Sequence, residues 1–318
     1  MSIPATWTGA VRDALDTAFG VPTADSVQPL TGGLSGAPVF RIEVAGRPYL
    51  LRLDPPVEGI ADPRRWHRCL QIAADLEVAP KVHFTGPSGV SIIDFVTPDP
   101  VGACWRGDRQ RLLADIGALL RRLHEGSAFP PLVDYLDGLE QLARPLKGWP
   151  EFTPALAAFR TLAKAYRRLE SQLVASHNDV NPTNLIHDGQ RLWLIDWAAA
   201  FQADRYIDLA AVAGFFARDE ASGDQLLTAY FGRPPTPAEQ GRFRLARLIN
   251  HFFYGVVMTG AEPPTERRDL EALHLALRQG EAVFASPGGR AEYARARLDA
   301  LIAAVEAPAF EEDCRLAA

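Results

Sequence analysis

Hydrophobic and polar positions in the first third of the chain follow the spacing of strands, with one helix among them. The stretch LTGGLSGAPVFRIEVAGRPYLLRLD alternates at Val39, Arg41 and Glu43, and its AGRP turn predicts a β-hairpin behind a glycine-rich loop. Apolar residues recur at helical spacing over 61–77, whereas APKVHF and GVSIIDFV predict two more strands. A helical stretch from Trp7 to Phe19 precedes them. This part is therefore expected to be a lobe of strands with one helix inserted.

The remainder of the chain has mainly helical periodicity. The turn-rich TPDP at 97–100 ends the last strand, which places a lobe boundary near residue 97. Two helices carry start signals, Thr153 followed by Pro154 and the capping box that begins at Thr236 and ends at Glu239. The pattern predicts an α+β chain, with an antiparallel sheet in an N-terminal lobe over 1–97 and a larger helical lobe over 98–318. The predicted helices of the second lobe cover about 108–125, 132–143, 154–174, 206–217, 222–231, 237–258, 265–284 and 288–306.

One polar segment interrupts this helical pattern. ASHNDVNPTNLIHDGQRLWLIDW, residues 175–197, contains a turn signal at Asp188-Gly189 that predicts a hairpin between strands Asn184–His187 and Arg191–Ile195. The polar residues of the segment then lie at strand ends and in one loop. Loops and strand ends held by a rigid scaffold are where proteins usually carry out chemistry.

Three side chains of this hairpin bear hard oxygen atoms. Asp179, Asn184 and Asp196 can meet at one edge of the hairpin, which suits Mg²⁺, because this ion is often held by one or two carboxylates while phosphates and water complete its shell. His177, Asp179 and Asn184 also reproduce the spacing H-x-D-x-x-x-x-N. In that pattern the aspartate accepts a hydroxyl proton and the asparagine holds a metal.

Composition narrows the class of protein. The 318 residues suit about two domains, and 47% hydrophobic and 23% charged residues with a net charge of -6 are ordinary for a globular protein and do not favour a polyanionic partner. The three scattered cysteines, Cys69, Cys104 and Cys314, indicate reduced thiols rather than a disulfide framework. With no secretory signal and no apolar run near the roughly 18 residues of a membrane span, we expect a cytoplasmic protein without nucleic-acid or membrane partners.

HNDVNPTN and LIDWAAAFQADRYIDLA resemble the kinase-like small-molecule phosphotransferases, the group that contains aminoglycoside phosphotransferases, choline and ethanolamine kinases, thiamine kinase and homoserine kinase. Pro182 stands at the proline of that group's H-x-D-x-x-P-x-N pattern, and ADRYIDLA matches the stretch after the metal-binding aspartate in aminoglycoside phosphotransferases. The resemblance covers most of the chain in order. It implies a protein-kinase-like two-lobe fold, ATP and Mg²⁺ as cofactors and a small-molecule hydroxyl acceptor.

The resemblance also implies roles for individual residues. Asp179 would be the catalytic base, Asn184 and Asp196 the Mg²⁺ ligands, and His177 the residue that organises the catalytic loop. Asp208 would be a structural acid that braces this loop. For the nucleotide, the matching positions are Gly32, Gly33, Ser35 and Gly36 over the phosphates, Arg52 at the phosphate-binding position, and Asp94, Phe95 and Val96 as the hinge at adenine.

Three positions depart from the family pattern. Arg52 replaces the usual lysine, as is common in choline kinases, and an arginine can grip phosphate oxygens bidentately. The helix position of the lysine's glutamate partner falls near His67, with acids only at the helix ends, Asp62 and Glu77, so Arg52 needs another partner. Ala198 stands where choline and thiamine kinases often have a glutamate that helps to bind a cation.

The candidate acceptor residues are mostly aromatic. Trp197, Phe201, His251 and Tyr254 are predicted to contribute to the acceptor pocket, and with Phe252 and Phe253 they offer rings for a cation–π cage. We expect an ATP- and Mg²⁺-dependent kinase that acts on choline, ethanolamine or a similar amino alcohol, because Arg52 and the Asp196-Trp197 pair favour that group. An aminoglycoside or thiamine-type alcohol is the next candidate.

Two hypotheses from other classes remain open at this point. The changes at Arg52 and His67 are compatible with a kinase-like module that binds nucleotide without catalysis. Alternatively, His177, Asp179, His187 and Asp188 could hold Zn²⁺ or Mn²⁺ in a hydrolase. The hydrolase hypothesis leaves the proline and asparagine spacing and the glycine-rich loop unexplained.

Overall fold

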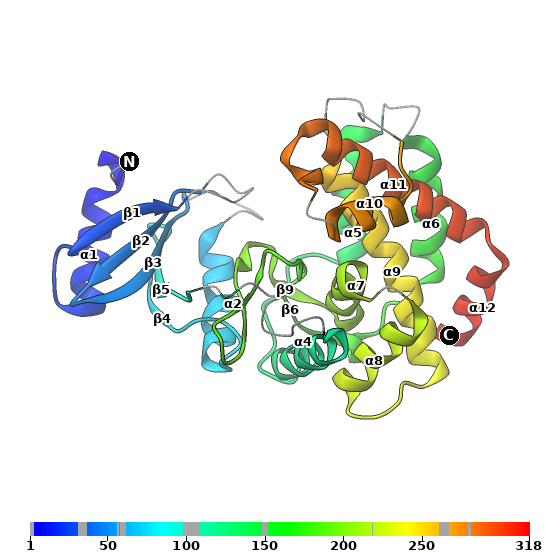
Figure 1. Cartoon of the computed structure of the whole chain (residues 1–318), viewed down its shortest axis with the longest axis horizontal. Helices are drawn as coiled ribbons and strands as arrows, with labels where there is room; N and C mark the ends of the chain where they lie inside the picture. Colours follow the sequence, from blue (N-terminus) through cyan, green and yellow to red (C-terminus); the bar gives the residue numbers. More distant parts are fainter. Residues whose placement is uncertain are drawn as a thin grey trace. The chain divides into compact units, whose positions relative to one another are not determined.

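The computed structural model describes residues 3–30, 37–55, 57, 62–97, 99, 108–147, 152–217, 219–260, 267–278 and 281–318. It separates into two compact units, which we call unit 1 (Met1–Leu132 with Val174–Gln202) and unit 2 (Val133–Leu173 with Ala203–Ala318) (Figure 1). These units do not follow the predicted division into nucleotide and acceptor lobes at residue 97, which stays a prediction. The predicted Gly32, Gly33, Ser35 and Gly36, and Cys104, lie outside the described residues.

Unit 1 is built on a five-stranded antiparallel sheet in the order β1-β2-β3-β5-β4. Between β2 and β3, Ala45 and Gly46 both have positive φ, 51° and 72°, as the tight turn of a twisted hairpin requires. Helix α1 (Thr8–Phe19) packs its buried Val11 and Leu15 on the alternating buried positions of the central strands. The strands are β1 (Ser26–Leu30), β2 (Val39–Val44), β3 (Arg47–Leu53), β4 (Val82–Thr85) and β5 (Val90–Asp94).

Helix α2 (Pro63–Asp75) is the predicted helix inserted among these strands. Asp62 caps it by accepting a hydrogen bond from the backbone of Arg64, and Pro63 occupies the first helical position, where a missing N–H costs nothing. Its buried face includes Trp66, His67, Cys69, Leu70 and Ala73, and it contacts the short 3-10 helix η6 (Trp197–Ala199) of the same unit.

The predicted hairpin in 175–197 is confirmed. Strands β7 (Leu185–His187) and β8 (Leu192–Leu194) pair in antiparallel fashion around Gly189, whose φ is 95°. Leu194 donates a backbone hydrogen bond to Val78, which ties the hairpin to the chain after α2. Helix α4 (Arg109–His124) completes unit 1, and β6 (Leu173–Ser176) pairs with β9 (Phe201–Asp204).

Unit 2 is helical, and α9 (Pro237–Met258) contacts other helices of the unit, among them α5, α6, α7, α8, α11 and α12. The predicted capping box of α9 is formed, because Thr236 and Glu239 each accept a hydrogen bond from the other's backbone N–H. Gly255 lets α11 approach closely, since an added Cβ would lie 2.4 Å from Leu298. The other helices are α5 (Tyr135–Leu142), α6 (Thr153–Ala165), α7 (Arg205–Phe216), α8 (Glu220–Phe231), α10 (Leu270–Arg278), α11 (Pro287–Glu306) and α12 (Pro308–Ala317).

The α+β prediction is confirmed, while several element bounds were wrong. Helix α6 ends at Ala165 rather than near 174, and Phe152 rather than Thr153 occupies its N-cap position. The predicted helix 265–284 is shorter, Leu270–Arg278, and is followed by a 3-10 helix, Val283–Ala285. Strand β1 and helix α12 were not predicted. Short 3-10 helices also occur at Ala5–Trp7, Arg144–Leu146 and Glu170–Gln172.

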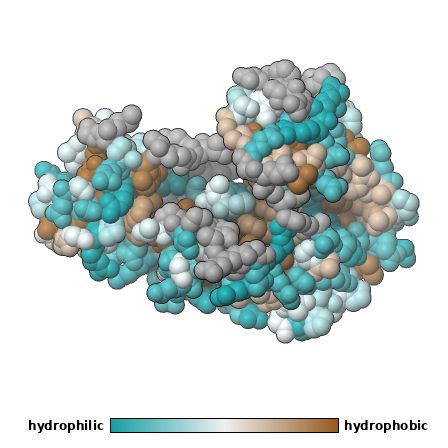
Figure 2. All heavy atoms as spheres, in the orientation of Figure 1, coloured by the Kyte–Doolittle hydropathy of each residue, from teal (hydrophilic) through white to brown (hydrophobic). Residues whose placement is uncertain are grey.

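The visible face of the molecule carries hydrophilic residues over most of its described surface, with hydrophobic residues in small groups among them (Figure 2). Of the helices described, none has the length and apolar character that spanning a membrane demands. Of the cysteines that the structure describes, Cys69 is buried, Cys314 is partly buried, and both are free thiols.

Candidate active site

The loop between β6 and β7 holds Asp179 through two asparagine amides. Asn181 donates from Nδ2 to Asp179 Oδ1 at 3.0 Å, and Asn184 donates from Nδ2 to Asp179 Oδ2 at 3.1 Å and to its backbone oxygen at 2.9 Å. These bonds fix the carboxylate in one orientation. Because Asn184 uses its amide nitrogen here, its Oδ1, the atom that a metal ion would need, takes no part in these bonds.

His177 connects the two chain segments that carry Asp179 and Asp196. Its Nδ1 accepts the backbone N–H of Asp179 at 3.3 Å, so the ring proton belongs on Nε2, which lies 2.9 Å from the backbone oxygen of Ile195. The ring is fully buried and meets Trp197 edge to face at 4.7 Å. This placement fits the predicted role of a loop organiser.

Asn178 was not singled out by the sequence, yet it ties the loop to the segment after Asp196. Its backbone is left-handed, with φ 65°, and its Nδ2 donates to the carbonyl oxygens of Ala199 at 3.0 Å and Phe201 at 3.3 Å. Ser176 completes the arrangement by donating to Asn178 Oδ1 at 2.8 Å. No pattern signal distinguishes an asparagine in this role from an ordinary loop residue.

Asp196 follows β8 and also has a left-handed backbone, with φ 61°. Its Oδ1 accepts from Arg52 Nη1 at 2.8 Å, while Arg52 Nε lies 2.9 Å and 3.2 Å from the two carboxylate oxygens of Asp54. The Arg52 guanidinium also lies over the Trp66 ring at 5.2 Å. Arg52, for which α2 offers no glutamate at the expected position, therefore has two carboxylates and an aromatic face as partners.

The electrostatics of this group follow from burial and the two carboxylates. Burial lowers the pKa of Arg52, but the charges of Asp196 and Asp54 outweigh it and hold the pKa above its usual value. Burial raises the pKa of Asp54 more than the neighbouring Arg52 lowers it. The guanidinium thus stays charged in a largely enclosed position.

His67 occupies the helix position where the kinase glutamate was expected. Its side chain is 6% exposed and meets the Trp66 ring edge to face at 4.3 Å. Burial, assisted by the positive charge of Arg52, lowers the pKa of His67 to about 4. A histidine that is neutral at pH 7 offers Arg52 no counter-charge, so the counter-charge comes from Asp54 and Asp196.

The predicted hinge residues lie at the end of β5. Asp94 donates its backbone N–H to the Lys81 carbonyl at 2.9 Å, and its carboxylate lies 2.7 Å from His83 Nε2. Phe95 follows, with the Arg41 guanidinium 5.5 Å from its ring centroid. The contact of these residues, and of Val96, with adenine stays a prediction.

Three of the rings offered for the aromatic cage pack inside the fold, and their contact with an acceptor stays a prediction. Trp197 is 2% exposed and donates from Nε1 to the Leu194 carbonyl at 3.3 Å. Phe252 is fully buried and stacks on Phe159 at 3.9 Å. Tyr254 is 2% exposed, and its ring already faces a cation of the protein, the Arg297 guanidinium at 5.4 Å.

The other acceptor candidates have different surroundings. Phe201, in β9, is half-buried, and its carbonyl accepts from Asn178. His251 lies in α9 of unit 2, with Nδ1 3.3 Å from Arg297 Nη1, and burial followed by the charge of Arg297 holds its pKa well below the usual value. Asp208, the predicted structural acid, is fully buried in α7.

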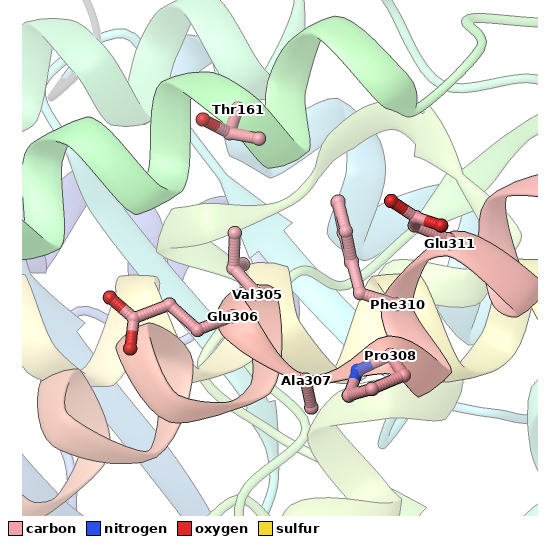
Figure 3. Close-up of a pocket in the computed structure, with 7 residues that line it drawn as sticks. All are labelled: Thr161, Val305, Glu306, Ala307, Pro308, Phe310 and Glu311. Carbon is pink, nitrogen blue, oxygen red and sulfur yellow. The ribbon is translucent and has the colours of Figure 1, made fainter.

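A separate pocket lies in unit 2 beside the junction of α11 and α12 (Figure 3). Thr161 of α6 and Phe310 of α12 are among its lining residues, together with Val305, Glu306 and Pro308. None of the predicted site residues lines it. The pocket therefore does not belong to the candidate active site.

The donor set around Asp179 suits magnesium better than a transition metal. Asn184 and Asp196 supply the amide and carboxylate oxygens that Mg²⁺ prefers, with room in the shell for phosphates and water. Among the residues that the structure describes, no three His, Cys, Asp or Glu side chains gather as a metal site. In addition, Asp188 accepts from Trp193 Nε1 at 2.7 Å and from two backbone N–H groups of its own turn. The hydrolase hypothesis thus loses its ligand cluster.

Comparisons with known proteins identify the family of the chain. The model of the phosphotransferase enzyme family APH matches residues 26–244. Thiamine kinase from Escherichia coli O17:K52:H18 (strain UMN026 / ExPEC) is 30% identical over 212 residues, which are 63% of this chain and 70% of that protein.

Solved structures show the same fold at lower sequence identity. A choline/ethanolamine kinase family protein from Mesorhizobium loti superposes with a TM-score of 0.68 at 20% identity, covering 98% of each chain. Choline kinase LicA from Streptococcus pneumoniae gives 0.63 at 14% identity, covering 93% of this chain and 100% of the other, and it has also been solved in complex with AMP. The expected protein-kinase-like fold is confirmed, and the chain belongs to the phosphotransferase enzyme family APH as a small-molecule kinase.

Proposed function

We propose that this kinase transfers the γ-phosphate of ATP to a hydroxyl group of a small metabolite, with Mg²⁺ at Asn184 and Asp196. The observation that supports the proposal is that the residues proposed as base, metal ligands and phosphate-binding cation all lie in unit 1 and are joined by hydrogen bonds. Asn184 is hydrogen-bonded to Asp179 at 3.1 Å, and Arg52 is paired with Asp196 at 2.8 Å. The AMP complex of LicA supports the use of an adenine nucleotide.

Each residue then has a defined part in the reaction. Asp179 orients the acceptor hydroxyl and takes its proton, and the amides of Asn181 and Asn184 hold the carboxylate in place for this step. Bound Mg²⁺ would neutralise charge on the phosphate oxygens. Arg52 turns from Asp196 to these oxygens while Asp54 keeps its Nε, so that positioning and electrostatics supply most of the rate.

For the acceptor, we propose an alcohol that carries a nitrogen cation, with thiamine as the first candidate. The family relatives named thiamine kinase support this choice, because their sequences are 30% identical to this chain over the matched residues. The sequence argument for choline or ethanolamine depended partly on the Asp196-Trp197 pair, and the burial of Trp197 removes that part of it. A screen of ADP release with thiamine, choline, ethanolamine, homoserine and aminoglycosides tests the choice directly.

The proposed base can be tested by the substitution Asp179→Asn. We expect the variant to bind ATP and Mg²⁺ like the wild type, while kcat falls by about 10²- to 10⁴-fold because the proton acceptor is lost. Isothermal titration calorimetry measures nucleotide binding, and coupled ADP release measures kcat.

Asp188→Asn is the matched control, since Asp188 belongs to the same hairpin but caps its turn. Full activity of Asp179→Asn would contradict the assignment of the base. Nucleotide binding by the wild type without ADP release on any acceptor would favour the non-catalytic module instead.

A further inference from the structure

Four successive carbonyl groups after Asp196 are held by side chains from two directions. Arg65, from helix α2, donates to the carbonyl oxygens of Ala198 and Ala200, the latter at 2.5 Å. Asn178, from the catalytic loop, donates to the intervening carbonyls of Ala199 and Phe201. The two side chains thus alternate along 198–201, and all of these residues belong to unit 1.

Helix α2 places a second donor on the same segment. Cys69 lies one turn after Arg65 on the buried face of the helix, and its Sγ is 3.6 Å from the Ala200 oxygen. Burial raises the pKa of Cys69 to about 11, so the sulfur keeps the proton that it can donate. The contact of α2 with η6 and the residue after it therefore includes polar groups directed at backbone oxygens.

This contact bears directly on the backbone of Asp196. Asp196 is left-handed and precedes η6, in which the Ala200 N–H donates to the Trp197 oxygen at 3.0 Å. An aspartate keeps this sparsely populated conformation only when its surroundings hold it. When the carbonyl groups of Ala198 and Ala200 are fixed, the turn after Asp196 is fixed as well. The direction of the Asp196 carboxylate depends on that turn.

The same helix also acts on the partner of Asp196. Trp66, next to Arg65, presents its ring to the Arg52 guanidinium at 5.2 Å. Arg65 thus holds the backbone that follows Asp196, while its neighbour Trp66 contacts the Arg52 guanidinium through its ring. Adjacent residues of α2 therefore act on both sides of the Arg52–Asp196 ion pair. No glutamate on α2 is needed for this connection.

We propose that Arg65 is a positioning residue for Asp196. By holding the carbonyl groups of Ala198 and Ala200, it keeps the Asp196 carboxylate in the orientation that metal binding needs. The inference rests on the proposed function, because it takes Asp196 as a Mg²⁺ ligand. Arg65 contacts neither nucleotide nor metal in this role. Its effect is therefore expected in metal affinity, and not in the affinity for metal-free nucleotide.

The test is Mn²⁺ binding in the presence of ADP, followed by the electron paramagnetic resonance signal of free Mn²⁺. We expect Arg65→Met to weaken Mn²⁺ binding about 10- to 100-fold, the range typical of residues that orient a metal ligand. ADP binding in EDTA should stay unchanged. Arg65→Lys should give an intermediate affinity, because a lysine ammonium does not reproduce the two-pronged geometry of the guanidinium.

Arg64→Met is the matched control, since Arg64 is exposed on the same helix and pairs with Asp62. Wild-type Mn²⁺ affinity in Arg65→Met would overturn the inference. If that variant does not fold by circular dichroism, Arg65→Lys carries the test, and wild-type affinity there overturns the inference equally. Asp196→Ala separates the two levels: if it binds Mn²⁺ and ADP like the wild type, the proposed metal site itself fails, whatever Arg65 does.

Discussion

At the residue scale, Arg52 shows how a strand can supply the counter-charge that a helix supplies in protein kinases. Asp54 directly follows β3, and its backbone N–H still bonds the Gly89 carbonyl. The extended path therefore continues, and side chains two positions apart on it point to the same side, which places Asp54 beside Arg52. This partner could have been found from the sequence, because YLLRLD displays the spacing. The Asp196 partner is 144 residues away, and only the family resemblance pointed to its neighbourhood.

The buried, neutral His67 makes a pH-dependent contribution to stability. Its pKa is about 4 in the folded chain and near 6.5 when exposed, so between these values the unfolded chain takes up a proton that the folded chain does not. The free energy of unfolding therefore falls as the pH drops through this window, by about 3 kcal/mol at pH 4.

We expect His67→Gln to remove this component, since glutamine does not titrate. Urea unfolding at pH 7 and pH 4.5 measures the free energy of unfolding of both proteins. Between these pH values the wild type should lose more unfolding free energy than the variant does. Parallel stability curves for the two proteins would show that His67 does not carry the pH dependence.

At the element scale, the start of α7 combines a helix cap with a buried ion pair. Asp204 accepts from the Tyr206 backbone N–H at 3.0 Å, from the Tyr166 hydroxyl at 3.0 Å and from Arg242 Nη2 at 2.7 Å. Arg242 is 4% exposed and its guanidinium lies 4.7 Å from the Tyr166 ring centroid. Burial raises the pKa of Asp204, against the effect of Arg242. The network joins α7, α9 and the chain after α6 within unit 2.

Replacing Asp204 therefore removes more than a cap. We expect Asp204→Ala to cost about 3–5 kcal/mol of unfolding free energy, because Arg242 is left as a buried charge without this carboxylate. Asp219→Ala is the comparison, since Asp219 caps α8 through a capping box, and it should cost about 1 kcal/mol. Chemical denaturation measures both values. Equal losses would mean that the ion pair adds nothing to the cap.

Most elements could be predicted from sequence because their apolar spacing matched the burial that the fold gives them. Helix α9 was predicted with its observed bounds, 237–258, whereas strand β1 (SVQPL) was missed, since an edge strand that contains Pro29 and is largely exposed has little pattern. Helix α6 was extended too far, because periodicity continues beyond Ala165 while the backbone turns extended at Tyr166, the residue that bonds Asp204. The role of Arg65 could not be predicted from the sequence, because its hydrogen-bond acceptors are backbone oxygens 133 and 135 residues away.

At the scale of the whole molecule, the described residues proposed for nucleotide and metal all fall in unit 1. Arg52, Asp94, Asp179, Asn184 and Asp196 share this unit, while His251 and Tyr254 are in unit 2. We expect Mg²⁺ and ADP to slow amide hydrogen exchange in β3 and in 174–202, with little change in α9 and α11. Mass spectrometry of peptides from the exchanged protein measures which segments are protected. Protection that was strongest in α9 and α11 would contradict the assignment of the nucleotide to unit 1.

The chain passes between the two units three times, at 132–133, 173–174 and 202–203, so neither unit is a continuous stretch of sequence. Arg52 leaves the ribosome 144 residues before Asp196, a delay of roughly 7 to 30 s at synthesis rates of about 5–20 residues per second. During that interval the residues of the N-terminal sheet and of α2 have been synthesised, whereas the segment that Arg65 and Arg52 bind has not. Unit 1 is therefore completed only after part of unit 2 has been made. For the same reason, no single cut or recombination point in the chain separates the proposed nucleotide site from the helices of unit 2.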